Sequence, residues 1–118
     1  MTTGLKILTL QAAALASSAV LLSTVSVVTR AAPAPAAAAV TIDNFTFRNP
    51  VVTVKPGTTV TWTNGDDIPH TVVSKNGVFK SKVLDTGDKF TFTFAKPGQF
   101  GYFCSLHPHM TGTIIVKA

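Results

Sequence analysis

Residues 40–118 predict an all-β fold, an antiparallel Greek-key β-sandwich of seven to eight short strands. Apolar and polar residues alternate over short runs, most cleanly in residues 90–94, as in strands with one buried face. Turn-forming pairs such as Pro56-Gly57 and Asn76-Gly77 separate these runs at short intervals. The region has no helical period, so both observations favour two packed sheets whose inner faces carry Phe, Val, Ile and Trp62.

The apolar runs follow one another along the chain with a turn signal after most of them. Asn64–Asp67 predicts a loop that leads to Pro69 and His70, and Asn76-Gly77 predicts a hairpin between the runs on either side. Residues 80–87 carry the weakest signal. The segments with a strand signal are residues 40–42, 45–47, 52–54, 60–62, 72–73, 78–79, 90–94, 100–104 and 113–117.

Residues 1–30 predict an export signal peptide. Lys6 precedes a long apolar run, Arg30 follows it, and residues 31–39 form an Ala- and Pro-rich cleavage region or linker, with A-x-A-like sites such as residues 37–39. The alternative is a permanent membrane anchor, since the run is long enough to span a bilayer. Gln11 and several Ser and Thr residues weaken a stable span, so we favour cleavage. We therefore expect a periplasmic protein whose folded domain is residues 40–118. It would be held at a membrane only if the N-terminal segment is not cleaved.

The charge and the residue types of the domain exclude several functions. Residues 40–118 carry eight Lys or Arg and five Asp, which gives +3 (8 − 5). These lysines are spread out without an interleaved aromatic stripe, so we expect no nucleic acid, although an acidic protein partner is favoured. The chain has no Glu and shows no nucleophile–base pair, paired carboxylates or phosphate loop, so we expect no enzyme. Its single Cys excludes an internal disulfide, and we expect a monomer.

One short loop gathers the chain's metal-binding side chains. Cys104, His107 and Met110 are spaced three apart, where an alternating strand gives way to a turn marked by Pro108 and Gly112. Thiolate and thioether are soft donors that favour Cu(I), whereas imidazoles also accept Cu(II), so the mixed set favours copper. Zinc is the poorer interpretation, because structural zinc sites use four Cys or His ligands and no methionine.

A further ligand has to come from another part of the chain. His70 lies 34 residues before Cys104 (104 − 70) and begins another predicted strand. Together with Cys104 and His107 it completes a trigonal plane, with Met110 as the weak axial contact of a blue-copper centre that holds one ion. His109 is the spare histidine, and we expect its ring to face solvent beside the site.

Each of these residues alone has an ordinary structural explanation. A lone Cys is most often a small buried hydrophobe, a lone Met fills the core, and a lone His is a satisfied polar residue. No packing rule requires the combination at this spacing and at a strand end. The metal interpretation therefore prevails.

The chain at this point resembles the cupredoxins, most closely the amicyanin and plastocyanin group. The resemblance covers residues 40–118 and is carried by Val60–Asn64, Pro69-His70, Gly98–Cys104 and the Cys-x-x-His-Pro-x-Met loop. It implies a mononuclear type 1 copper protein that shuttles single electrons, with His70, Cys104, His107 and Met110 as ligands. One departure is Thr71, where family members usually carry Asn to tie the ligand segments together; a hydroxyl can make part of that hydrogen bonding.

The favoured function is therefore an exported electron carrier that exchanges electrons with other redox proteins. Docking is expected on an apolar patch around His107, formed by Leu106, Pro108, Ile68 and Pro69. The alternative is a periplasmic copper-binding or copper-delivery protein without electron transfer. A copper enzyme would need a further metal or substrate site that three histidines cannot supply.

Overall fold

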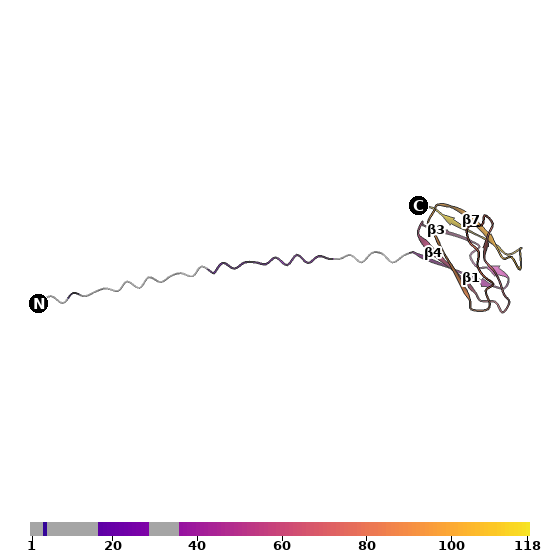
Figure 1. Cartoon of the computed structure of the whole chain (residues 1–118), viewed down its shortest axis with the longest axis horizontal. Helices are drawn as coiled ribbons and strands as arrows, with labels where there is room; N and C mark the ends of the chain where they lie inside the picture. The colour runs from indigo at the N-terminus through magenta and orange to yellow at the C-terminus, as the bar shows by residue number, and fades with distance from the viewer. Residues whose placement is uncertain (1–3, 5–16, 29–35) are drawn as a thin grey trace. The chain divides into compact units, whose positions relative to one another are not determined.

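The computed structural model describes residue 4 and residues 17–28 and 36–118, and within them it contains eight β-strands and no helix (Figure 1). The predicted all-β sandwich is confirmed. The strands are β1 (Ala37–Asp43), β2 (Thr46–Phe47), β3 (Val51–Val54), β4 (Thr58–Asn64), β5 (Val73–Ser74), β6 (Lys89–Phe94), β7 (Gly98–Phe103) and β8 (Thr111–Val116).

The strands form two four-stranded sheets, β2-β1-β4-β6 and β3-β8-β7-β5. Two pairings, β1 with β4 and β3 with β8, are parallel, so the sheets are mixed and not wholly antiparallel as predicted. The chain changes sheet at every connection from β2 to β7, which places strands side by side that are not consecutive in sequence. Alternation along one strand carries no information about its neighbour's direction, because both directions bury the same face.

The folded domain begins before Val40. Ala37, Ala38 and Ala39 belong to β1 and lie opposite Thr59, Val60 and Thr61 of β4. These three alanines were predicted to belong to the linker, because a run of small residues shows neither alternation nor a β-branched signal. Their backbone hydrogen bonds need no particular side chain, and the strand is therefore longer than the sequence indicates.

Two further predictions on the strands need correction. Val78 and Phe79 form no strand, although the predicted turn exists: Ser74 N–H donates to the Phe79 carbonyl at 2.9 Å, and Val73 bridges Lys80. Phe45 was predicted to lie in a strand but lies in the β1–β2 turn with φ at 54°. That left-handed backbone is unusual for a bulky residue.

The N-terminal part forms a unit of its own, and only residue 4 and residues 17–28 of it are described. Residues 17–28 contain no regular element and have exposed side chains. The remainder of the predicted signal peptide and residues 31–35 lie outside the described residues. Across the described ranges, no helix has the length and apolar character needed to cross a membrane.

The core is a layer of aromatic and branched side chains between the sheets. Trp62 of β4 and Tyr102 of β7 are fully buried and meet edge to face at 5.4 Å between ring centroids. Phe47 packs on the other side of Tyr102 at 4.8 Å. Each such burial contributes roughly 1.5–3 kcal/mol to folding. Tyr102 stands two residues before Cys104, so this packing fixes the end of β7 that carries the cysteine.

Candidate metal centre

Three loops meet at one end of the sandwich. Because β1 and β4 run parallel, with Ile42 opposite Asn64, the turn after β1 and the loop after β4 leave the sheet side by side. β7 ends at Phe103, opposite Thr111 of β8, so residues 104–110 form the hairpin loop between these two strands. The candidate ligands follow from these loops: His70 comes from the loop after β4, and Cys104, His107 and Met110 come from the β7–β8 loop.

His70 is fully buried and held by its backbone. Its N–H donates to the Leu84 carbonyl at 3.1 Å, and Leu84 N–H donates back to the His70 carbonyl at 2.8 Å. The ring places Nε2 2.8 Å from Asp66 Oδ2 and Nδ1 3.7 Å from Cys104 Sγ. A carboxylate beside Nε2 keeps a proton on that nitrogen, so Nδ1 is the ring atom available to a metal, and it faces the Cys104 sulfur.

Cys104 is a free, fully buried cysteine one residue beyond β7. Its N–H donates to the Met110 carbonyl at 3.1 Å, which closes the loop on itself. Burial by itself would raise the pKa of the thiol, but the Thr71 N–H, 3.4 Å from Sγ, and the imidazoles of His70 and His107 lower the pKa to about 6. The thiolate that binds a metal is therefore easily formed here.

His107 completes a compact set of donors. Its Nδ1 lies 3.8 Å from Cys104 Sγ, and its half-buried ring lies 5.0 Å from the ring of His70. The donor atoms of His70, Cys104 and His107 all lie within 4.8 Å of one another. Bonds of about 2.0 Å to nitrogen and about 2.3 Å to sulfur, 120° apart, require a nitrogen–sulfur distance of roughly 3.7 Å. The observed distances of 3.7 and 3.8 Å fit a trigonal site.

The other two loop residues differ in their surroundings. Met110 is buried, and its N–H donates to the His107 carbonyl at 2.9 Å, so the loop turns back at this residue. His109 is exposed, with its ring 6.4 Å from that of His107 and outside the donor cluster, as expected for the spare histidine. The loop thus buries its thioether residue and leaves the extra imidazole in solvent.

Thr71 links the two ligand-bearing loops. Its Oγ1 accepts a hydrogen bond from Ser105 N–H at 2.7 Å and lies 2.7 Å from Ser105 Oγ. The same Oγ1 lies 3.8 Å from Cys104 Sγ, in addition to the N–H that Thr71 donates to the sulfur. The Thr71 hydroxyl therefore links the two ligand-bearing segments by hydrogen bonds, in place of the Asn that family members usually carry.

Sequence reasoning missed Asp66 as part of the site. Besides contacting His70, its carboxylate accepts hydrogen bonds from Asn44 N–H at 2.6 Å and from Phe45 N–H at 2.9 Å. Burial opposes ionisation, but the Phe45 N–H, His70 and the Asn44 N–H together lower the pKa of Asp66. One carboxylate therefore joins the β1–β2 turn to the buried histidine. Its position four residues before His70 was the available signal, but spacing alone gives no reason to prefer it to Asp67.

Phe45 is the second residue that was missed. Its ring meets the ring of His70 edge to face at 5.6 Å and that of His107 at 5.0 Å. The hydrogen bonds to Asp66 hold Phe45 and Asn44 at positive φ, of 54° and 51°. Backbone strain of this kind persists where surrounding contacts overdetermine it, often at functional sites. The ring is 37% exposed, so it forms part of the surface above both imidazoles.

Residues 11–116 match the family model of the cupredoxin-like domain. The chain belongs to the cupredoxin-like family. It is 38% identical to amicyanin of Paracoccus versutus over 93 residues, which are 74% of this chain and 70% of the relative. A purple cupredoxin from Nitrosopumilus maritimus has a solved structure that superposes with a TM-score of 0.64 at 35% identity, over 68% of this chain and 99% of that one. A Cu(I) structure of an amicyanin variant superposes with a TM-score of 0.66 at 31% identity, over 69% of this chain and 82% of the amicyanin chain.

The cofactor of this cupredoxin is one copper ion of type 1. The family match and the cluster of one thiol with two imidazoles agree on this metal, because soft sulfur donors select copper while trigonal His2Cys geometry is typical of blue-copper sites. The predicted resemblance to the amicyanin and plastocyanin group is confirmed.

Proposed function

We propose that this cupredoxin is an exported carrier of single electrons, with His70, Cys104 and His107 as equatorial copper ligands and Met110 as the weak axial one. The observation that carries the proposal is the preformed trio of donor atoms within 4.8 Å, two of them from buried residues and one from the half-buried His107. When bound, the copper ion supplies a one-electron Cu(II)/Cu(I) couple. A site that already has its geometry needs little rearrangement between the two oxidation states, which favours fast exchange.

The protein's own contribution is to hold the donors rigid and to exclude water. Asp66 fixes the tautomer and the orientation of His70, and both side chains are buried. Thr71 donates its N–H to the Cys104 sulfur, which stabilises the thiolate and moderates its donation to the metal. The packing of Tyr102 in the core fixes the end of β7 that carries the cysteine. These contacts support a role in which copper stays bound while electrons pass.

Electrons are proposed to pass through the His107 end of the domain. His107 is half-buried and its ring contacts that of Phe45, while Leu106, the residue before it, is 48% exposed. Exposed apolar surface of this kind marks protein-interaction sites. The +3 charge of residues 40–118 favours an acidic redox partner, which would dock transiently on a monomer.

A copper-delivery role is the second candidate. Delivery requires ligands that a recipient can reach, whereas His70 and Cys104 are fully buried and Met110 is 2% exposed. Burial of the ligands therefore favours electron transfer. An enzymatic role is not proposed, since the sequence offers neither a further metal cluster nor an acid–base pair.

Export is proposed from the sequence of residues 1–30. Because Ala37 begins β1, cleavage has to leave Ala37 in the mature chain if the strand is to stay whole. The mass of protein isolated from the periplasm should correspond to an N-terminus at or before Ala37. A mature chain that starts at Val40 would contradict the observed extent of β1.

The electron-carrier proposal is tested with purified protein loaded with Cu(II). We expect strong visible absorption from the Cys104 thiolate, and its loss in Cys104→Ser. Leu106→Glu should keep the absorption but slow electron exchange, whereas Gln99→Glu, an equal charge change at the start of β7, should leave exchange unaltered. Stopped-flow reduction by a redox protein measures the rates. A pale Cu(II) complex would exclude a blue-copper centre. A coloured protein that loses copper to a chelator faster than it exchanges electrons would favour the copper-delivery role.

A further inference from the structure

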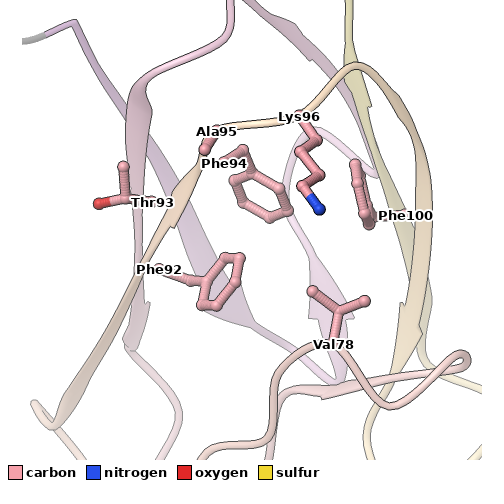
Figure 2. A pocket seen from close by; sticks show the side chains of 7 residues that line it. All are labelled: Val78, Phe92, Thr93, Phe94, Ala95, Lys96 and Phe100. Atoms are coloured by element: carbon pink, nitrogen blue, oxygen red, sulfur yellow. The ribbon is translucent and has the colours of Figure 1, made fainter.

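The sandwich carries an apolar pocket that has no part in the metal centre. It has a volume of about 320 Å³ and opens between β6 and β7, near the turn that joins them (Figure 2). β7 begins at this turn and ends beside Cys104, so the pocket lies at the opposite end of that strand from the copper ligands. Its walls include Phe92 and Phe94 of β6, Phe100 of β7 and Val78 from the turn after β5.

The pocket exists because the sandwich is open along this side. β6 and β5 are each an edge strand of their sheet, and β5 has only two residues, so within residues 36–118 no strand closes the gap beside β6. Phe92, on the inward-facing side of β6, is consequently only half-buried, and Val78 is 43% exposed at the mouth. Concave apolar sites of this kind are where small ligands bind in proteins.

The aromatic walls are held in place by one another. Phe94 packs on Phe92 at 4.9 Å and on Phe100 at 5.2 Å between ring centroids. Phe79 supports the pocket from the core, at 5.1 Å from Phe92 and 5.6 Å from Phe94. Rings fixed by neighbouring rings have few alternative rotamers to lose, so the pocket is formed before any ligand arrives.

A single charged side chain lines the pocket. In Figure 2 the Lys96 side chain extends from the β6–β7 turn into the space between Phe94 and Phe100, with its nitrogen toward the pocket. The other polar side chain of the lining, Thr93, points away from the pocket in the same view, and its Oγ1 contacts Thr59 Oγ1 at 2.7 Å. No acidic residue contributes to the lining. The pocket therefore offers aromatic walls and one ammonium group.

We propose that this pocket binds a small aromatic monocarboxylate, whose ring packs against Phe92, Phe94 and Phe100 while its carboxylate pairs with Lys96. The volume lies at the low end of ligand pockets, which fits one or two fused rings better than a long lipid chain. Flat rings gain edge-to-face or offset contacts with phenylalanines. The ammonium group selects an anion over a neutral compound of the same shape.

The test uses 2-naphthoate as the probe and the intact, diamagnetic Cu(I) protein. Amide NMR spectra are recorded during a titration at constant ionic strength. We expect saturable shifts confined to residues 78–79 and 92–100, and binding of neutral 2-naphthamide weaker by roughly two- to fivefold, as for one partly exposed charge pair. Shifts that rise linearly and spread over all exposed lysines would overturn the proposal, and so would equal affinity for the amide.

Variants separate the pocket from general basicity. Lys96→Gln should reduce the affinity for 2-naphthoate to that for 2-naphthamide, while Lys117→Gln, another exposed lysine outside the pocket, should change nothing. Val78→Glu places a carboxylate at the mouth without altering the core and should abolish binding of the anion. Unchanged affinity in both Lys96→Gln and Val78→Glu would exclude this pocket as the site. The visible spectrum of the Cu(II) form should be the same in all variants, since none contacts the metal centre.

Discussion

Thr71 shows how one hydroxyl can serve two loops that lie far apart in sequence. Thr71 Oγ1 accepts a hydrogen bond from Ser105 N–H and lies near the Cys104 sulfur, while the Thr71 N–H donates to the same sulfur. A donor hydrogen bond withdraws charge from a thiolate, which weakens its donation to Cu(II) more than to Cu(I). Thr71 is thus placed to influence both the rigidity of the site and its potential.

Thr71→Val should lower the reduction potential and destabilise the folded protein by about 1 kcal/mol, because Ser105 N–H loses its acceptor in a partly buried position. Thr71→Ser is the matched control, since it restores the hydroxyl and should recover most of both effects. Voltammetry and urea unfolding measure them. A potential unchanged in Thr71→Val would show that only the backbone N–H acts on the sulfur.

The β7–β8 hairpin is the element that sets the ligand spacing. Phe103 opposite Thr111 fixes both ends of the loop, and the Cys104–Met110 backbone bond closes it. Gly112 follows directly, opposite Tyr102, whose ring lies against the glycine so closely that a Cβ there would overlap the ring. Tyr102 cannot yield, because it is fully buried between Trp62 and Phe47.

Gly112→Ala should therefore destabilise the fold by about 3 kcal/mol through overpacking, and should broaden or shift the visible band by displacing the loop. Gly101→Ala is the control on the same hairpin, because its added Cβ would meet only the flexible Lys75 side chain. Urea unfolding of the copper forms provides the comparison. Equal stability of the two variants would mean that Tyr102 moves more freely than its packing implies.

The two sheets meet at the candidate metal centre. His70 follows β4 of one sheet and Cys104 follows β7 of the other, so if both are ligands as proposed, we expect copper to stabilise the packing of the sheets as a ligand bound only by the folded state. Removal of copper leaves a buried thiol whose pKa is lowered to about 6, against about 8.5 in an unfolded chain. This thiol therefore makes the metal-free stability depend on pH in the neutral and mildly alkaline range.

The direction of this pH dependence follows from the linkage between proton binding and folding. A depressed pKa adds stability that is complete above about pH 8.5 and is lost as pH falls through about 6, with a magnitude of at most about 3 kcal/mol. Unfolding of metal-free wild type and of Cys104→Ser in urea, with a non-thiol reductant, should show a stability difference that grows from pH 5 to pH 9. Parallel pH curves for the two proteins would contradict a thiolate stabilised by Thr71 and the imidazoles.

Local patterns in the chain were enough to predict the class of fold and the type of metal. Alternation and turn pairs require only neighbours along the chain, so most strands could be located from them. A chain with one Cys, three His and two Met leaves few possible ligand sets, and the short spacing from Cys104 to Met110 selected one.

Tertiary structure decided what depends on contacts between distant segments. Four such features leave no periodic trace in the sequence. They are the parallel pairings, the early start of β1 at Ala37, the contacts of the Asp66 carboxylate with both His70 and the β1–β2 turn, and the open side of the sandwich. Backbone hydrogen bonds pair strands regardless of side chain, and a side chain's partner across 20 or more residues depends on the final packing of both sheets. Asp66 and Phe45, which contact the candidate ligands, therefore emerged only from the folded chain, whereas Thr71 could be named from the sequence.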